Sequence, residues 1–162
     1  PLEAFAAEHL VDRTGLQLVW APRVPRARRA AHEAEGAAKH PGYHIIERDV
    51  RAGFVVAGPR ADHFPLYDEA PVLGERPPWG LDFASEQRRR QAIEAARDSG
   101  APMATAPLGL RLGSVPITAI LLVHPVYEGG GRPRTVERRQ ALLRGVAIGV
   151  LRMQGFLEDT MA

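Results

Sequence analysis

The residues that could carry chemistry are few and far apart in the sequence. Among the six histidines, only His40 and His44 lie close together, and Pro41-Gly42 between them breaks the helix that would place both imidazoles on one face. The chain has no cysteine, which excludes a disulfide framework, a thiolate zinc site and a cysteine nucleophile. The histidine pattern predicts structural or surface residues, and no metal site.

The other candidate motifs lack the context that catalysis needs. Glycines 129–131 are not followed by the Gly-Lys-Ser/Thr ending of a phosphate loop, so they favour a flexible turn. None of the serines sits in a nucleophile-elbow context; they are Ser85, Ser99 and Ser114. Carboxylate pairs such as Asp68-Glu69 are typical of a solvated surface. We therefore expect no catalytic residues, no cofactor and a protein that is not an enzyme.

The basic residues are nearly all arginines, since Lys39 is the sole lysine, and the formal net charge is only +2. The tightest basic cluster is Arg88-Arg89-Arg90, and a second surrounds Arg138. Neither is interleaved with aromatic residues as in a nucleic-acid stacking platform. The clusters favour solvated helix faces, and we expect no nucleic-acid partner.

The pattern of apolar residues predicts an α+β fold, with N-terminal helices followed by an antiparallel sheet with flanking helices. An amphipathic helix is expected over residues 2–13, and Ala, Arg and Glu predict a second over 26–39. Between them, the alternation in residues 16–20 is too loose to assign. Pro22 and Pro25 favour an extended connection there.

Five segments have the character of strands, with differing clarity. Residues 43–48, 54–56 and 63–67 predict short strands. Residues 117–123 form a near-continuous apolar run, which predicts a central strand buried on both faces. Residues 145–151 fit a strand and a helix equally well, and the pattern alone leaves both open.

A helix is predicted over residues 85–99, with Ser85 as its N-cap and Gly100 just past its end. One face of this helix is shared by Arg89, Ala92, Ile93 and Ala96. One arginine is therefore aimed at the apolar side. Arg89 would either meet a ligand there, or reach solvent or a local carboxylate such as Asp82.

Several segments occur in a characteristic order from about residue 16 to the C-terminus. They are Trp20-Ala21-Pro22-Arg23-Val24-Pro25, Arg29 with Glu33, Phe64-Pro65-Leu66, Gly80-Leu81-Asp82-Phe83-Ala84-Ser85, Ala96-Arg97-Asp98-Ser99-Gly100, Thr105-Ala106-Pro107 with Leu110, Pro125-Val126-Tyr127, and Thr135-Val136-Glu137-Arg138-Arg139 followed by Gly145. In this order the chain resembles the CHASE domain, the sensory module found outside the membrane in receptor histidine kinases and nucleotide cyclases.

The resemblance implies a long N-terminal helix followed by PAS-like modules. It implies a helical stalk region over 1–40, a PAS-like ligand-sensing module over 41–152 and a C-terminal helical connection over 153–162. It also favours the strand for residues 145–151. Their small residues Gly145, Ala147 and Gly149 would then share one sheet face, which either leaves room for a ligand or is closely packed.

The resemblance also implies a ligand pocket between the central sheet and the helices and loops that cover one face. The candidate ligand-binding residues are Leu81, Phe83, Arg89, Thr105, Leu110, Arg111, Leu121 and Val123. Where cytokinin-binding members carry an Asp and a Thr, this chain has Arg89 and Val123. Two arginines, Arg89 and Arg111, would favour an anionic or carbonyl-bearing small molecule instead.

The function that the resemblance implies is a small-molecule sensor on the periplasmic or extracellular side of the bacterial inner membrane. Ligand binding would be relayed through the terminal helices of a homodimer formed by the N-terminal helix. Membrane contact would come only from segments outside this chain. Two alternatives stay open: a ligand-free dimerisation and spacing module of the ectodomain, and a cytoplasmic enzyme of another type.

Overall fold

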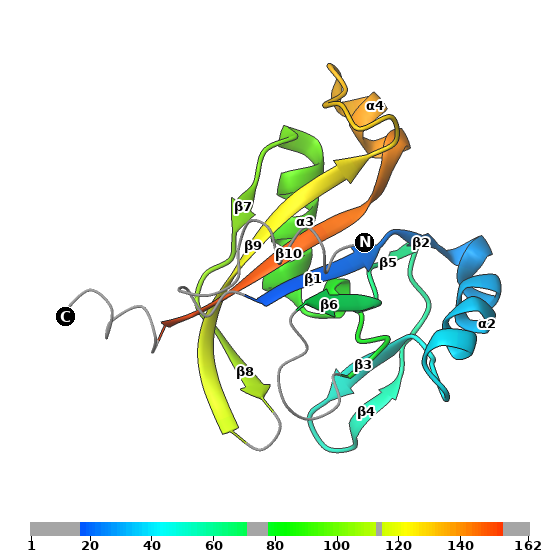
Figure 1. The fold of residues 1–162 in the computed structure, drawn as a ribbon. Coiled ribbons are helices and arrows are strands. Elements are labelled where there is room, and N and C mark those ends of the chain that lie inside the picture. The colour runs from blue at the N-terminus through cyan, green and yellow to red at the C-terminus, as the bar shows by residue number, and fades with distance from the viewer. Residues whose placement is uncertain (1–16, 71–77, 113–114, 154–162) are drawn as a thin grey trace.

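The computed structural model describes residues 17–70, 78–112 and 115–153, which form an α+β arrangement (Figure 1). The described residues contain three α-helices and one main antiparallel sheet, with the strand order β6-β1-β10-β9-β7 and β8 paired to β9. The predicted α+β class and the antiparallel sheet are confirmed. The helices expected over residues 2–13 and after Met153 lie outside the described residues.

Two long strands form the centre of the sheet. Strand β9 (Val115–Tyr127) pairs with β10 (Leu143–Arg152), so residues 145–151 form a strand and not a helix. On the far side of β9, β7 (Met103–Ala104) and β8 (Leu108–Leu112) add short antiparallel pairings.

Strand β9 is buried on one face only, which corrects the prediction that both faces are covered. Ala119, Leu121 and Val123 are almost inaccessible, whereas Leu122 is 38% exposed and His124 is exposed. Successive side chains of a strand point to opposite faces, and helix α3 covers only one of them. Because the other face of β9 also carries branched residues, the apolar run of residues 117–123 resembled a strand that is buried on both faces.

The segment expected as an extended connection is a strand of the main sheet. Strand β1 (Gln17–Pro22) pairs with β10 on one side and with β6 (Asp68–Ala70) on the other. The chain then enters β2 (Val24–Pro25), which pairs with β5 (Asp62–His63).

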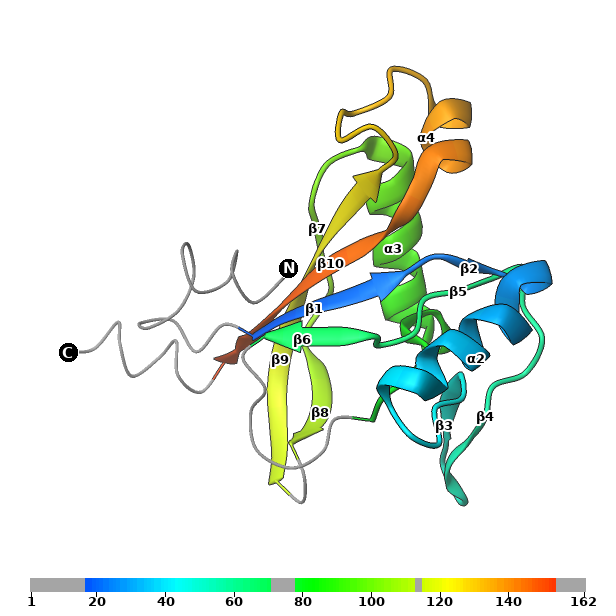
Figure 2. The same ribbon diagram turned by 45° about the vertical axis from the view of Figure 1, so that its right-hand side comes forward.

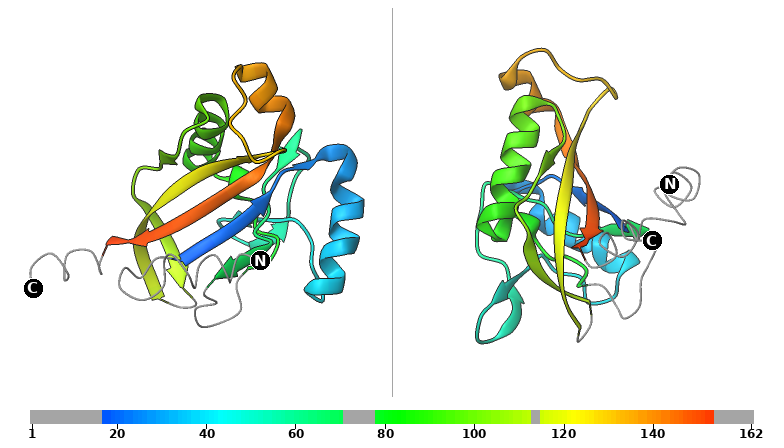
Figure 3. Two further views of the ribbon diagram at one scale, coloured as in Figure 1. Left: turned by 45° about the horizontal axis from the view of Figure 1, so that its top comes forward. Right: turned by 90° about the vertical axis from the view of Figure 1, so that its left-hand side faces the viewer.

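Helix α3 (Gln87–Ser99) lies along one face of the sheet, as the right-hand view of Figure 3 shows. The helix ends at Gly100, whose φ of 69° is left-handed, as expected of this position. The N-cap is Glu86 and not the predicted Ser85: its carboxylate accepts hydrogen bonds from the N–H groups of Arg88 and Arg89. Ser85 belongs to a short 3-10 turn (Phe83–Ser85), and its hydroxyl donates to the Asp82 carbonyl oxygen.

The predicted helix over 26–39 is confirmed as a 3-10 turn (Arg26–Arg28) followed by α2 (Arg29–Lys39), which Figure 2 shows beside the sheet. Arg29 donates to the Ala57 carbonyl oxygen at 2.9 Å and pairs with Glu33. The Glu33 carboxylate also accepts the Ile45 N–H at 3.0 Å. These contacts join α2 to the chain on both sides of the next hairpin.

That hairpin consists of β3 (Ile46–Asp49) and β4 (Gly53–Val56), and it projects on the same side of the sheet as α3 (Figure 3). Within the predicted strand of residues 43–48, only the last three residues are paired.

At the other end of the molecule lies α4 (Val136–Leu142). Its N-cap is Thr135, whose hydroxyl accepts the Arg138 N–H.

Candidate functional site

The segment of residues 80–85 leads into α3 and fixes the ring of Phe83 against the core. Gly80 has a φ of 85°, and a Cβ at this position would collide with the carbonyl oxygen of His44. Asp82 is fully buried and accepts hydrogen bonds from the N–H groups of Phe64 and Ala84, at 2.9 and 3.0 Å. The segment is therefore held by its own backbone and by one buried carboxylate.

Arg89 lies where the helical spacing predicts, on the apolar side of α3. Its guanidinium carbon is 5.6 Å from the centre of the Phe83 ring, and its buried Nε has no hydrogen-bond partner among the described residues. The alternative in which Arg89 pairs with Asp82 is wrong, because Asp82 is bound by His63 at 2.8 Å and by Arg60 at 3.4 Å.

The electrostatic surroundings of Arg89 are unfavourable for its charge. Burial, above all, lowers the pKa of Arg89; the carboxylate of Glu86 opposes this effect, and the positive charge of Arg48 adds to it. Within the described parts of the chain, no carboxylate lies within ion-pair distance of Arg89. Among the residues that the structure describes, Arg89 is thus a cation held against an aromatic ring without an ion-pair partner.

Most of the other predicted site residues lie on the same side of the sheet. Phe83, Leu121 and Val123 are buried members of one apolar cluster, against which Leu81 and Leu110 pack. Thr105 is buried and exchanges two hydrogen bonds with the backbone of Leu121, so its side-chain oxygen is used in the scaffold. Arg111 of β8 pairs with Pro116 of β9, and the side chain of Arg111 lies outside the described part of the structure.

The middle of the space between α3 and the sheet is packed with side chains. Ile93 and Ala96 on α3, and Leu121 and Ile148 on the strands, are each at most 2% exposed. Small alanines let the helix approach the sheet closely, so side chains close the interior. Among the described side chains of the predicted site, the buried polar atom without a hydrogen-bond partner is the Nε of Arg89, at the start of α3.

At the Gly145 end of β10 the chain is closely packed. A Cβ on Gly145 would lie 2.7 Å from the Trp20 ring and 2.5 Å from the carbonyl oxygen of Ala21. The small residue lets β1 and β10 approach, which favours close packing over room for a ligand at this position.

Two surface grooves lie away from the predicted pocket. One, of about 390 Å³, runs along the other flank of α3 and is lined by charged residues that include Arg60, Asp62, Arg90, Glu94 and Arg97. The other, of about 470 Å³, lies between the turn after β9 and α4. The spacing of residues 90, 94 and 97 on one helix face is the signal that could have indicated the first groove.

In the first groove, two of the arginines already have carboxylate partners. Arg60 pairs with Glu47 at 2.6 Å, and Arg97 pairs with Asp98 at 2.6 Å. The cations of this groove are therefore largely neutralised by their neighbours, in contrast to Arg89.

The histidines of α2 belong to an aromatic cluster that joins this helix to the domain. The His40 ring stacks on Trp79 at 4.1 Å, and His32 hydrogen-bonds the Tyr43 hydroxyl at 2.8 Å. In the described ranges, no group of three or more His, Asp or Glu side chains could hold a metal ion. None of the helices in those ranges is long and apolar enough to cross a membrane.

Comparison with known proteins gives one match that spans the chain. The family model described as CHASE domain matches residues 2–162. A search of curated proteins finds no match.

Proposed function

The chain belongs to the CHASE domain family, the extracytoplasmic sensory domains of membrane receptor kinases and cyclases, and on this premise we propose that it senses a small organic anion. The proposed role is binding and not catalysis. The ligand would shift the ends of a PAS-like module, and a dimer formed through the N-terminal helix would pass this change to the membrane segments of a receptor kinase or cyclase. The site would face the periplasm or the exterior of a bacterial cell.

The observation that carries the proposal is the environment of Arg89. A largely buried guanidinium that has no ion-pair partner among the described residues is costly, because desolvation disfavours its charge and the carboxylate of Glu86 offsets this effect only in part. A carboxylate or phosphate would supply the missing acceptors, and arginine binds such groups through two parallel hydrogen bonds. The Phe83 ring under the guanidinium offers an apolar surface for the rest of the molecule.

The packing of the interior limits where such a ligand would bind. Since the middle of α3 is packed against the sheet, the proposed site lies at the start of the helix, where Arg89 lies over the Phe83 ring. Leu121, Val123 and Thr105 would then not contact the ligand, and would instead form the packed core behind the site.

The same packing favours a second candidate function, a ligand-free spacing module of the ectodomain. In that case Arg89 would be a scaffold residue, and no small anion would stabilise the domain. The two functions therefore differ in one measurable property, the response of stability to organic acids.

A thermal-shift comparison of benzoate with its neutral analogue benzamide tests the proposal. We expect benzoate to raise the Tm of the wild type and of the control Arg88→Ala, and benzamide to have no effect. At 100 times the Kd, binding adds about 2.7 kcal/mol, which corresponds to a rise of about 5–10 °C for a chain of this size. Arg89→Ala should lose the rise.

If benzoate and other organic acids leave the Tm of the wild type unchanged, a ligand-free spacing module explains the domain better than a sensor does. Equal rises in the wild type and in Arg89→Ala would show that anions bind elsewhere, for example in the groove along the other flank of α3.

A further inference from the structure

The β3–β4 hairpin carries a second arginine toward the start of α3. The register pairs Arg48 with Phe54 and Ile46 with Val56, so these four side chains share one face of the hairpin. The Arg48 guanidinium carbon lies 5.9 Å from the centre of the Phe54 ring, much as Arg89 lies over Phe83. Each guanidinium thus lies against an aromatic ring.

Backbone hydrogen bonds fix the base of the hairpin to the segment that positions Phe83. The Ile46 N–H donates to the Gly80 carbonyl oxygen at 2.9 Å, and the Asp82 N–H donates to the Ile46 carbonyl oxygen at 2.8 Å. At the tip, the Asp49 carboxylate accepts two turn N–H groups, and Gly53 has a φ of 80°. Arg48 is therefore attached to a preorganised ribbon.

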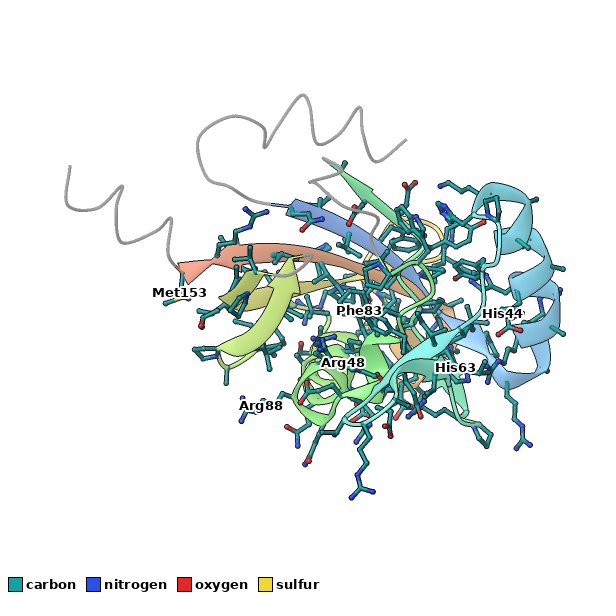
Figure 4. The ribbon with its side chains drawn as sticks, turned by 90° about the horizontal axis from the view of Figure 1, so that it is seen from below. His44, Arg48, His63, Phe83, Arg88 and Met153 are labelled. Atoms are coloured by element: carbon teal, nitrogen blue, oxygen red, sulfur yellow. The ribbon has the colours of Figure 1, made fainter. Side chains whose placement is uncertain are left out.

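The two arginines are close enough for their charges to interact. Seen from below, the labels of Arg48 and Phe83 fall in the same part of the view, beside α3 (Figure 4). The charge of Arg48 adds to burial in lowering the pKa of Arg89. Two like charges near each other repel, and an anion bound to both would stabilise both charged forms.

The carboxylates around this pair are engaged elsewhere. Glu86 caps the backbone N–H groups at the start of α3. Glu47 points to the other face of the hairpin and pairs with Arg60 at 2.6 Å. Asp49 is used by the turn. Among the described residues, neither Arg48 nor Arg89 has an ion pair.

We propose that Arg48 and Arg89 bind the same anionic group of the ligand, with Phe54 and Phe83 on either side of its apolar body. This inference rests on the proposed sensory function and defines its ligand class, an organic carboxylate or phosphonate with a flat apolar part. A polar, highly hydrated anion would leave both rings without contact, so it would bind more weakly. The hairpin is then a specificity-determining part of the site.

Calorimetric titration with benzoate and phenylphosphonate tests the pair. The variants are Arg48→Ala, Arg89→Ala and the double variant, and the matched control is Arg51→Ala, an exposed arginine in the turn of the same hairpin. Each single change should weaken binding about 10- to 100-fold, as expected for one charge-assisted contact. The double change should weaken it by less than the product of the two single effects, because both arginines hold one group.

The outcomes separate this inference from the function on which it rests. If Arg48→Ala binds both probes like the wild type while Arg89→Ala does not, the pair is wrong and the Arg89 site stands. If the two effects multiply, the arginines do not share one group, which also overturns the pair. If the wild type binds neither probe, both proposals fail. Arg89→Gln replaces Arg89→Ala if urea unfolding shows that the alanine variant is not folded.

Discussion

Asp82→Ala tests whether the segment of residues 80–85 is a scaffold that holds the site in place. The Asp82 carboxylate is fully buried and accepts the N–H groups of Phe64 and Ala84 and the Nδ1 of His63, at 2.9, 3.0 and 2.8 Å. Alanine would remove the acceptor and leave these donors buried. The expected result is a large loss of stability with the fold retained.

The size of the loss follows from these contacts. A buried donor without a partner costs about 1–3 kcal/mol, and Asp82→Ala leaves the three donors named above without their acceptor, so we expect a loss of about 4 kcal/mol. Asp82→Asn keeps one oxygen for the two backbone N–H groups. His63 can accept from the new amide in its other tautomer, so we expect only about 1–2 kcal/mol for this variant.

Urea unfolding followed by tryptophan fluorescence measures both losses. With a slope of about 2 kcal/mol per molar urea, Asp82→Ala should lower the midpoint by about 2 M. The matched control is Asp49→Ala, which removes two similar hydrogen bonds in an exposed turn where water replaces them. If Asp82→Ala lowers the midpoint no more than Asp49→Ala does, the buried-scaffold argument is wrong.

For two further substitutions, the structure determines the direction of the change in stability. Burial raises the pKa of Glu69 to about 7, against the hydrogen bond from Gln17, so the folded state keeps a proton that the unfolded state loses at about 4.5. The stability of the wild type should therefore fall as the pH rises from about 4.5 to about 7. The urea midpoints of Glu69→Gln should not show this fall. If the variant shows the same fall as the wild type, another group is responsible for it. A Cβ on Gly36 would overlap the Tyr43 ring. Gly36→Ala should therefore lower the stability by about 1–3 kcal/mol, despite a gain in helix propensity of about 1 kcal/mol. A higher Tm of the variant would contradict this.

The elements that the sequence predicts well are those whose burial repeats along the chain. Ala92, Ile93 and Ala96 recur at helical spacing with Arg89, so the face of α3 that meets the sheet could be identified. The strand at 117–123 is also clear. Its one-sided burial could not be predicted, because branched residues occupy the uncovered face as well.

The elements that the sequence does not predict depend on distant partners. Strand β1 has a loose pattern, and its conformation is imposed by pairing with β10, more than 120 residues later. The position of the hairpin that carries Arg48 depends on the hydrogen bonds of Ile46 to residues 80 and 82. No local pattern encodes such contacts, and an exposed arginine in a short strand resembles any surface residue.

Amide chemical-shift mapping during a benzoate titration locates the ligand on the domain and so tests whether an organic anion binds at Arg89. We expect saturable shifts at the start of α3, around Phe83 and Arg89, and on β3 around Arg48. Shifts confined to the groove along residues 90–97, or no saturable shifts at all, would contradict it.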